Sequence, residues 1–500
     1  MTALDSDNPP TIAIIGGGFS GCMVAVHLLR SATVPIAIKL IERGPTVGPG
    51  VAYGTREERH LLNVPAGNMS AFPEDAGHFL RWLDSHGDSP FTAESFAPRR
   101  RYGAYLQAIL REAEADAPRL AQLEKIQDEA IAILPDQEGD RIQLRSGRTL
   151  HASRIVLAVG NFPPSDPVVA ESAFYRSPRY SSDPWSPTAL SHIDPLDSIL
   201  LIGSGLTTID LVLALQARGH QGVIHLISRH GLLPQCHRPS VPPYPPFLTI
   251  ADVSSTLRIL LRRVRREIDQ AARQGHDWRT VIDALRPQTQ VLWRALTAVE
   301  KRRFLRHLRP YWDNHRHRIA PEVAATLDRL QQSGQLRVYA GCIRSYEERD
   351  DGVDVSYRPR HQPELHTVRV NRVINCTGPE GNYRKLQHPL IMNLLESGRI
   401  RPDSLTLGLE VEANGALVIA TGVASRRLYT LGPPRKGSLW ETIAVPELRE
   451  QAQALARQLL QSLRVKAAPA FSDTEGVMTQ QAAAHIHDGR KGATQTQAPE

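Results

Sequence analysis

The feature that most constrains the fold is the stretch TIAIIGGGFSG at residues 11–21, where a short apolar run meets a cluster of glycines. The apolar run predicts a buried strand, and the residues after the glycines have the period of a helix. Gly16, Gly18 and Gly21 follow the Gly-x-Gly-x-x-Gly spacing of a dinucleotide-binding turn. In such a turn the first glycine permits the bend, the second lets a pyrophosphate approach the backbone, and the third lets helix and strand pack closely.

A carboxylate at the end of the next strand supports this interpretation. Residues 36–43, IAIKLIER, predict a second strand that carries Glu42 near its end. An acid about 20 residues beyond the last glycine can accept hydrogen bonds from an adenosine ribose. The N-terminal β-α-β unit therefore predicts a site for the ADP half of a dinucleotide.

A second strand–glycine–helix–strand unit occupies residues 197–231. Its turn contains Gly203 and Gly205, and Thr208 stands at the third glycine position, which predicts a slightly larger gap between helix and strand. The following strand ends in Ser-Arg-His rather than in an acid. Arg229 could pair with a 2′-phosphate, which favours NADPH over NADH; the alternative is an ordinary exposed arginine.

Two unlike dinucleotide turns in one chain of 500 residues predict an α/β fold with two Rossmann-type dinucleotide-binding domains, the architecture of two-dinucleotide flavoproteins. The expected cofactors are FAD at the first turn and NAD(P)H at the second. The predicted parts are an FAD-binding domain (10–165 plus 370–465), an NAD(P)-binding domain (166–231 plus 334–369), a Pro-rich connector with a basic helical insertion (232–333) and a disordered tail (467–500).

Composition excludes several other classes. No run of about 18 apolar residues is present, and the N-terminus lacks the pattern of a secretory signal, so we expect a cytoplasmic protein that does not bind a membrane. The four cysteines are far apart and form no C-x-x-C pair. This argues against a metal site and against a disulfide reductase.

Positive charge is concentrated in one segment. Between Arg258 and Arg318 there are 16 Lys/Arg and 6 Asp/Glu, an excess larger than the net charge of +7 of the whole chain. The simplest interpretation is a solvated face of basic helices, and a funnel for an anionic cofactor or substrate is the second. No nucleic-acid-binding motif accompanies these charges, so no nucleic-acid partner is expected.

Longer strings carry a more specific resemblance, which covers roughly residues 10–460. The chain resembles the bacterial FAD/NAD(P)-binding family described as YdhS-like, a relative of flavin-dependent monooxygenases. The strings are GVAYGTREERHLLNVPAGNMSAFPEDAGHFLRWL (50–83), FAPRRRYGAYL (96–106), ISRHGLLPQCHRP (227–239) and GSLWETIAVPELREQA (437–452).

The resemblance implies further contacts with FAD. The loop NVPAGNMSAFP would lie beside the isoalloxazine, with Asn63, Asn68 and Ser70 as polar contacts. Gly432 and the start of a helix near Thr442 would approach the pyrimidine edge of the flavin.

Two residues near that loop and several histidines have more than one possible role. Arg100 and Tyr102 could buttress the loop or form a structural corner. No catalytic residue is assigned, although His60, His307, His315 and His317 are possible bases. The F-x-G-x-x-x-H-x-x-x-W/P signature of Baeyer–Villiger monooxygenases is absent.

The activity implied is that of an FAD-dependent, NAD(P)H-using monooxygenase, which hydroxylates a small, anionic substrate with molecular oxygen through a flavin hydroperoxide. The best single substrate is urate, converted to 5-hydroxyisourate. One alternative is N-hydroxylation of an amine. Others are an NAD(P)H–flavin oxidoreductase that passes electrons to an acceptor without inserting oxygen, and a redox-sensing module that holds FAD without turnover.

Overall fold

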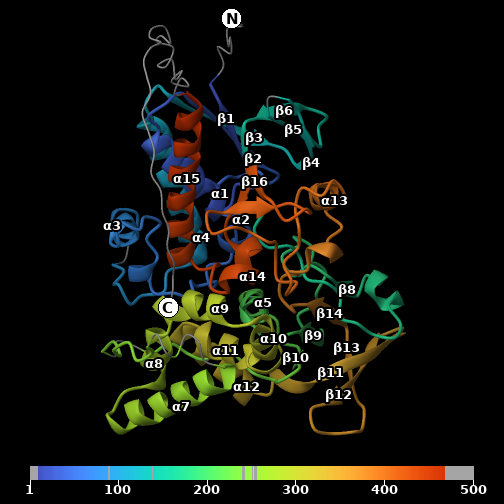
Figure 1. Ribbon diagram of the computed structural model, residues 1–500. Coiled ribbons are helices and arrows are strands. Elements are labelled where there is room, and N and C mark those ends of the chain that lie inside the picture. Colours follow the sequence, from blue (N-terminus) through green and yellow to red (C-terminus); the bar gives the residue numbers. More distant parts are fainter. Residues whose placement is uncertain are drawn as a thin grey trace, which may run out of the picture.

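The computed structural model describes residues 9–467 except 88–89, 138, 239–241, 250–251 and 253–255. It combines two sheets that are largely parallel with a group of helices (Figure 1). The tail predicted for residues 467–500 lies outside the described residues beyond Ala467, where the last helix ends. None of the helices in the described ranges is both long enough and apolar enough to cross a membrane.

The first sheet contains both strands of the N-terminal β-α-β unit. Its strands are β1 (Thr11–Ile15), β2 (Ile36–Glu42), β3 (Ala121–Gln127), β7 (Arg154–Leu157), β15 (Ala416–Val418) and β16 (Ala424–Thr430). They are arranged in the order β15-β16-β7-β1-β2-β3, and all neighbours are parallel except β15 and β16. The carboxyl ends of β1, β2, β7 and β16 therefore meet at one edge of the sheet.

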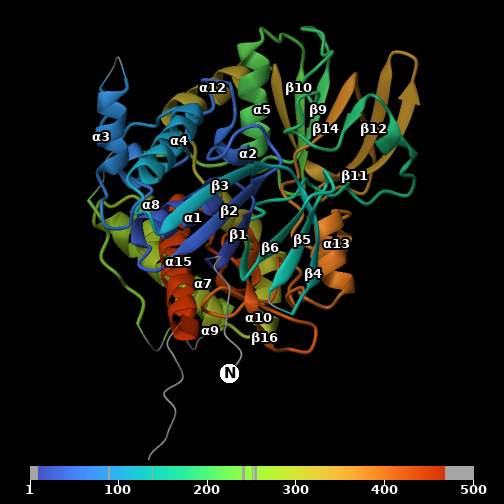
Figure 2. The same ribbon diagram turned by 90° about the horizontal axis from the view of Figure 1, so that it is seen from above.

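Both faces of the first sheet are covered, as Figure 2 shows. One face packs against α1 (Phe19–Ser31), α4 (Arg99–Ala115) and α15 (Val445–Ala467). The other face packs against α13 (Pro389–Glu396) and a small antiparallel sheet, which consists of β4 (Ala130–Pro135), β5 (Asp140–Leu144) and β6 (Thr149–Ala152). Ile12 and Ile14 enter the first core whereas Ala13 and Ile15 enter the second, which explains why β1 is apolar throughout.

The second sheet has the order β13-β12-β11-β10-β9-β14-β8. Its strands are β8 (Tyr180–Ser181), β9 (Ile199–Ile202), β10 (Ile224–Ser228), β11 (Leu336–Arg349), β12 (Gly352–Pro359), β13 (His366–Val370) and β14 (Arg372–Asn375). Helices α5 (Leu206–Ala217) and α12 (Pro321–Gln332) pack on one face. The domain boundary predicted at residue 370 falls one strand early, because β14 pairs with β9 and β8 of this sheet.

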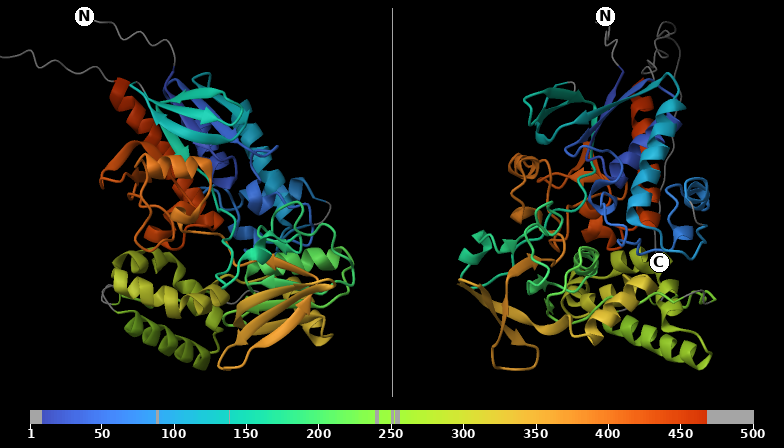
Figure 3. Two further views of the ribbon diagram at one scale, coloured as in Figure 1. Left: turned by 90° about the vertical axis from the view of Figure 1, so that its right-hand side faces the viewer. Right: turned by 180° about the vertical axis from the view of Figure 1, so that it is seen from behind.

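Helices connect β10 to β11. They are α7 (Leu257–Arg273), α8 (Trp278–Ala284), α9 (Arg286–Ala295), α10 (Ala298–His307), α11 (Arg309–Arg316) and α12. Figure 3 shows these yellow-green helices together at one end of the molecule, beside the second sheet. Trp440, which follows the short α14 (Lys436–Leu439), packs among their side chains, with its ring 5.0 Å from those of Trp293 and Phe304. The α/β fold with a helical insertion agrees with the predicted fold class.

Candidate functional site

The first glycine turn is enclosed by backbone. Gly16 has a φ of +104°, which only glycine adopts readily, and a Cβ there would lie 2.3 Å from the carbonyl oxygen of Ala158. A Cβ on Gly21 would lie 1.9 Å from the carbonyl oxygen of Gly16. The bend and the close approach of helix to strand therefore both require glycine, as the motif predicts.

Glu42 reaches across this turn. Its carboxylate accepts a hydrogen bond of 2.6 Å from the backbone N–H of Gly17 and one of 2.7 Å from that of Gly44. Gly18 lies against Gly50, and a Cβ on Gly50 would be 3.0 Å from the Cα of Gly18. The carboxylate is thus fixed at the carboxyl end of β2, where a dinucleotide fold places the ribose, although contact of Glu42 with a ribose stays a prediction.

Gly432 follows β16 and lies next to the same turn. It has a φ of +76°, and a Cβ on it would be 3.2 Å from Oγ of Ser20. Its N–H donates to Oε1 of Gln451 at 3.1 Å, the amide of Gln451 donates to Oγ1 of Thr442 at 2.9 Å, and the Thr442 hydroxyl donates to the carbonyl of Gly432 at 3.2 Å. The structure therefore brings Gly432 and Thr442 together but uses the Thr442 hydroxyl internally. The helix begins at Val445, three residues later than expected.

The loop at residues 63–70 is held by protein contacts. The side-chain oxygen of Asn63 accepts a hydrogen bond from Arg99 at 3.2 Å. The hydroxyl of Ser70 donates to carbonyls within its own loop, those of Phe72 at 3.2 Å and Asp75 at 2.5 Å. Asn68 is exposed. Direct contacts of these three residues with FAD stay predictions.

Arg99, rather than either of the two residues named from the resemblance, holds the loop. Arg100 is exposed and pairs with Glu58, and Tyr102 is fully buried in the first core. Three successive arginines precede Tyr102, and only the backbone trace shows which one points inward. Sequence reasoning had no signal that singled out Arg99.

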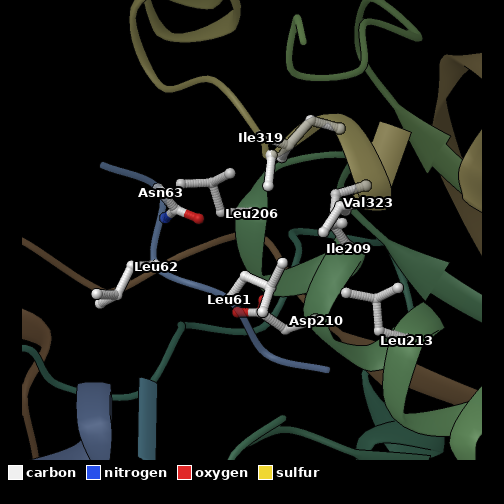
Figure 4. Close-up of a pocket in the computed structure, with 10 residues that line it drawn as sticks. Leu61, Leu62, Asn63, Leu206, Ile209, Asp210, Leu213, Ile319 and Val323 are labelled. Atoms are coloured by element: carbon white, nitrogen blue, oxygen red, sulfur yellow. The ribbon is translucent and has the colours of Figure 1, made fainter. Parts of the chain in front are cut away.

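The Arg99 guanidinium joins the loop to the second sheet's helix α5. It donates to Oδ2 of Asp210 at 2.6 Å and to the carbonyl of Leu61 at 3.0 Å, and both members of the ion pair are nearly buried. His60 contacts the carbonyl of Asp210 through Nε2 at 2.8 Å, so this histidine has a structural position. Figure 4 shows Asp210 and Asn63 around a small cavity, whose volume of about 10 Å³ suits one water molecule and no substrate.

The second glycine turn is open. Gly203 has a φ of +118°, and a Cβ there would lie 2.4 Å from the carbonyl oxygen of Cys376. A Cβ on Gly205, by contrast, would meet no atom within 4 Å. Thr208 is fully buried in α5. The hydroxyl of Ser204 donates to Oγ of Ser228 at 2.8 Å, which joins the turn to the end of β10.

Arg229 follows Ser228 at that end of β10. Its side chain is exposed, and it makes no hydrogen bond or ion pair with any described residue. Burial, together with the charges of Arg360 and Arg229, lowers the pKa of the neighbouring His230. Two guanidinium groups therefore stand near His230, where a 2′-phosphate could be recognised.

The remaining histidine candidates do not converge on the first turn. His307 is exposed, His315 contacts the carbonyl of Tyr311, and His317 lies 3.9 Å from Asp313 on α11. Within the described ranges, no group of three or more His, Cys, Asp or Glu side chains is arranged to hold a metal ion.

The comparisons with known proteins agree with this geometry. Residues 13–162 match the model of a family described as FAD-NAD(P)-binding. A nitrosuccinic acid synthase from Aspergillus oryzae is 24% identical over 238 residues, which are 42% of this chain but only 36% of that relative's length.

Three solved structures share the fold over almost the whole chain. An L-lysine 6-monooxygenase from Pseudomonas syringae has 17% identity and a TM-score of 0.61, covering 91% of this chain and 100% of that one. An ornithine N-hydroxylase from Kutzneria sp. 744 has 15% identity and a TM-score of 0.57, with coverages of 92% and 100%. A cadaverine monooxygenase from Erwinia amylovora, solved with FAD, has 16% identity and a TM-score of 0.59, with coverages of 96% and 100%.

At these identities the structural similarity establishes the fold. The expectations of an oxidoreductase and of FAD and NAD(P)H as cofactors agree with the family match and with this fold, whereas nothing in the comparisons supports the YdhS-like or urate hydroxylase type. Residues 13–162 match a family described as FAD-NAD(P)-binding, and the chain shares its fold with the solved lysine and ornithine monooxygenases.

Proposed function

We propose that the protein is an FAD-dependent, NAD(P)H-using monooxygenase that hydroxylates the nitrogen of a small amine. The observation that carries the proposal is the presence of two unlike glycine turns, one enclosed and one open, in a fold that 92% of this chain shares with an ornithine N-hydroxylase. Such a pair suits one flavin that stays bound and one nicotinamide cofactor that exchanges.

In this proposal the first turn holds the ADP half of FAD. The backbone of Gly18 and the N-terminus of α1 face the pyrophosphate, and Glu42 accepts the ribose hydroxyls. Gly205 lets the second pyrophosphate approach α5, and Arg229 pairs with the 2′-phosphate of NADPH. The flavin, when bound, supplies the oxygen chemistry, and the chain binds, orients and excludes water.

A primary amine, molecular oxygen, NADPH and one proton give a hydroxylamine, NADP⁺ and water. NADPH supplies the electron pair, one oxygen atom is inserted into an N–H bond, and the other oxygen atom leaves as water.

An amine accounts for the comparisons better than urate does. The three solved neighbours are named for ornithine, lysine or cadaverine, all of which carry primary amines. The sequence relative is named for making nitrosuccinic acid, a dicarboxylic acid with an oxidised nitrogen. The earlier expectation of an anionic substrate remains compatible with an amino acid.

The test is to purify the yellow protein and follow NADPH and NADH oxidation, peroxide and hydroxylamine together. L-Aspartate, L-ornithine, L-lysine, cadaverine and urate are supplied one at a time, with catalase added in parallel to identify oxygen returned from peroxide. We expect at least one amine to yield hydroxylamine in proportion to the NADPH consumed. If urate is the only compound consumed, the result would support urate hydroxylation instead. NADPH oxidation that yields only peroxide with every compound would contradict monooxygenation.

A further inference from the structure

Helix α11 contacts both the segment that follows β10 and the segment that follows α14. At its start the ring of Tyr311 lies 5.6 Å from the ring of His230, which follows Arg229 at the open turn. One residue later, Nε1 of Trp312 donates to Oε1 of Glu441 at 3.2 Å, close to the predicted flavin edge. Figure 1 shows α14, which directly precedes Trp440 and Glu441, at the junction with α9, α10 and α11. In the proposed function, this junction adjoins both the segment predicted to approach the flavin and the segment predicted to hold the nicotinamide cofactor.

Two cations at this junction are poorly paired. The Arg316 side chain is 11% exposed, its Nε makes no hydrogen bond, and its nearest carboxylate oxygen, on Glu441, is 3.8 Å away. The side-chain amine of the half-buried Lys436 makes no hydrogen bond or ion pair with any described residue, and it stands 5.1 Å from the centre of the Trp440 ring. A buried cation that lacks a strong partner is costly, so the site has a deficit of negative charge.

The surrounding charges do not remove the deficit. Burial lowers the pKa of Arg316 and of Lys436. Burial also lowers the pKa of His317, on which the charges of Glu441, Arg316 and Lys436 act as well. Arg309 and Asp313 pair with each other at 3.3 Å. Glu441 is therefore the one carboxylate left for two cations within this cluster of described residues.

Backbone strain marks the same place. Trp440 has a φ of +63° although it is a bulky residue, and it is 5% exposed. Such a conformation costs on the order of 1–3 kcal/mol and persists where surrounding contacts impose it, often at a ligand site. It turns the chain between Lys436 and Glu441.

We infer that Lys436 and Arg316 bind the carboxylate of an amino-acid substrate, and that Glu441 faces its amine. The inference rests on the proposed N-hydroxylation and deepens it by naming the substrate class. A carboxylate would supply the charge that the two cations lack. A diamine would place a second ammonium beside Lys436 and would be rejected.

The experiment separates binding from chemistry. Succinate, a dicarboxylate without an amine, is titrated calorimetrically into the oxidised FAD-loaded protein, and cadaverine is titrated in parallel. We expect succinate to bind and cadaverine not to bind. Lys436→Met should raise the Kd for succinate at least tenfold, Arg316→Met should do the same, and Lys436→Arg should restore most of the affinity.

Lys301→Met is the matched control, because the Lys301 amine also lies over a tryptophan, 5.6 Å from the centre of the Trp293 ring, but outside the cluster. We expect its Kd for succinate to stay within twofold of the wild type. Retained flavin absorbance checks that each methionine variant is folded.

The outcomes also distinguish this inference from the proposed function. Absent succinate binding, a Kd for succinate that stays at the wild-type value in either methionine variant, or tighter binding of cadaverine would overturn the carboxylate site even if amines are hydroxylated. If no amine is hydroxylated but succinate binds through Lys436, the proposed reaction fails and the anion site stands.

Discussion

The two glycine turns follow the same plan but differ in what surrounds them. At the first, the positions of Gly16 and Gly21 are enclosed by backbone carbonyls, and a carboxylate bridges the turn. At the second, Gly203 is enclosed in the same way, but Thr208 takes the place of the third glycine, and the arginine that follows the next strand makes no ion pair with a described residue. The second glycine position has room in both turns, since a Cβ on Gly18 would be 3.6 Å from Gly50 and one on Gly205 would meet no atom within 4 Å. We infer that the first turn is built for a cofactor that remains bound and the second for one that enters and leaves.

The largest expected effect comes from adding one methyl group to each turn. Gly21→Ala places a Cβ against the carbonyl of Gly16, which no side-chain rotation can relieve. We expect a loss of at least about 3 kcal/mol in unfolding free energy, at the top of the range for overpacking, and no flavin absorbance.

Gly205→Ala changes the second glycine of the other turn, the position that Gly18 holds in the first, and its Cβ meets nothing within 4 Å. We expect the melting temperature and the flavin content to stay near the wild-type values, while the KM for NADPH rises. Thermal melts and flavin spectra of Gly21→Ala and Gly205→Ala measure the stability and the flavin content of each variant. Equal destabilisation by the two substitutions would show that the turns do not differ as described.

The next effect concerns the contact that ties the two sheets together. Arg99→Met leaves the nearly buried carboxylate of Asp210 without its partner and frees the carbonyl of Leu61. Breaking one side of a buried pair costs about 3 kcal/mol or more. We expect a fall of that size in urea unfolding. The double variant Arg99→Met with Asp210→Leu should recover part of the loss, and no recovery would contradict the pairing.

A third comparison uses one histidine from each half. Burial lowers the pKa of His27 on α1 and of His225 on β10 from about 6.5 to about 4. Between these values the unfolded chain binds protons that the folded chain does not, so stability is complete above pH 6.5 and is lost as the pH falls towards 4.

We expect each histidine to cost about 2 kcal/mol of unfolding free energy between pH 7 and pH 5. Urea unfolding at pH 5, 6 and 7 measures this, with His27→Leu and His225→Leu compared separately. Each variant should show a shallower loss towards acid pH. An unchanged slope in either variant would mean that folding does not lower the pKa of its histidine.

The sequence predicted the parts of the molecule that depend on local backbone chemistry. The glycine positions, the strand before each turn and Glu42 at the end of β2 all follow from steric limits and short-range periodicity. The charge excess between Arg258 and Arg318 combines different environments, since many arginines of α7 are exposed whereas Arg316 is nearly buried and Arg318 is buried. Composition cannot separate these environments.

What the sequence could not predict depends on contacts between distant segments. Arg99 was not distinguished from Arg100 because its partners are Leu61, Asn63 and Asp210, which belong to other elements. Similarly, β14 was placed with the wrong sheet, because strand order is set by pairing with β9 and not by the sequence of β14. The helix expected near Thr442 begins later because the Trp440 backbone turns first.

The smallest expected effect tests cofactor choice at the open turn. Arg229→Ala removes one exposed guanidinium that lacks an ion-pair partner among the described residues, so folding should not change. If this group pairs with a 2′-phosphate, the KM for NADPH should rise about tenfold, which corresponds to about 1.4 kcal/mol, and the KM for NADH should not move. Arg360→Ala should act in the same direction, because Arg360 and Arg229 both act on His230.

Initial rates with both cofactors over a range of salt concentrations measure this effect. A preference that depends on pairing with a phosphate should weaken as ionic strength rises, because exposed charges are screened over about 10 Å at 0.1 M salt. Equal losses for NADPH and NADH would mean that Arg229 supports the turn as a whole. The second turn would then differ from the first only in the backbone space around Gly205. No difference in the charge that faces the cofactor would remain.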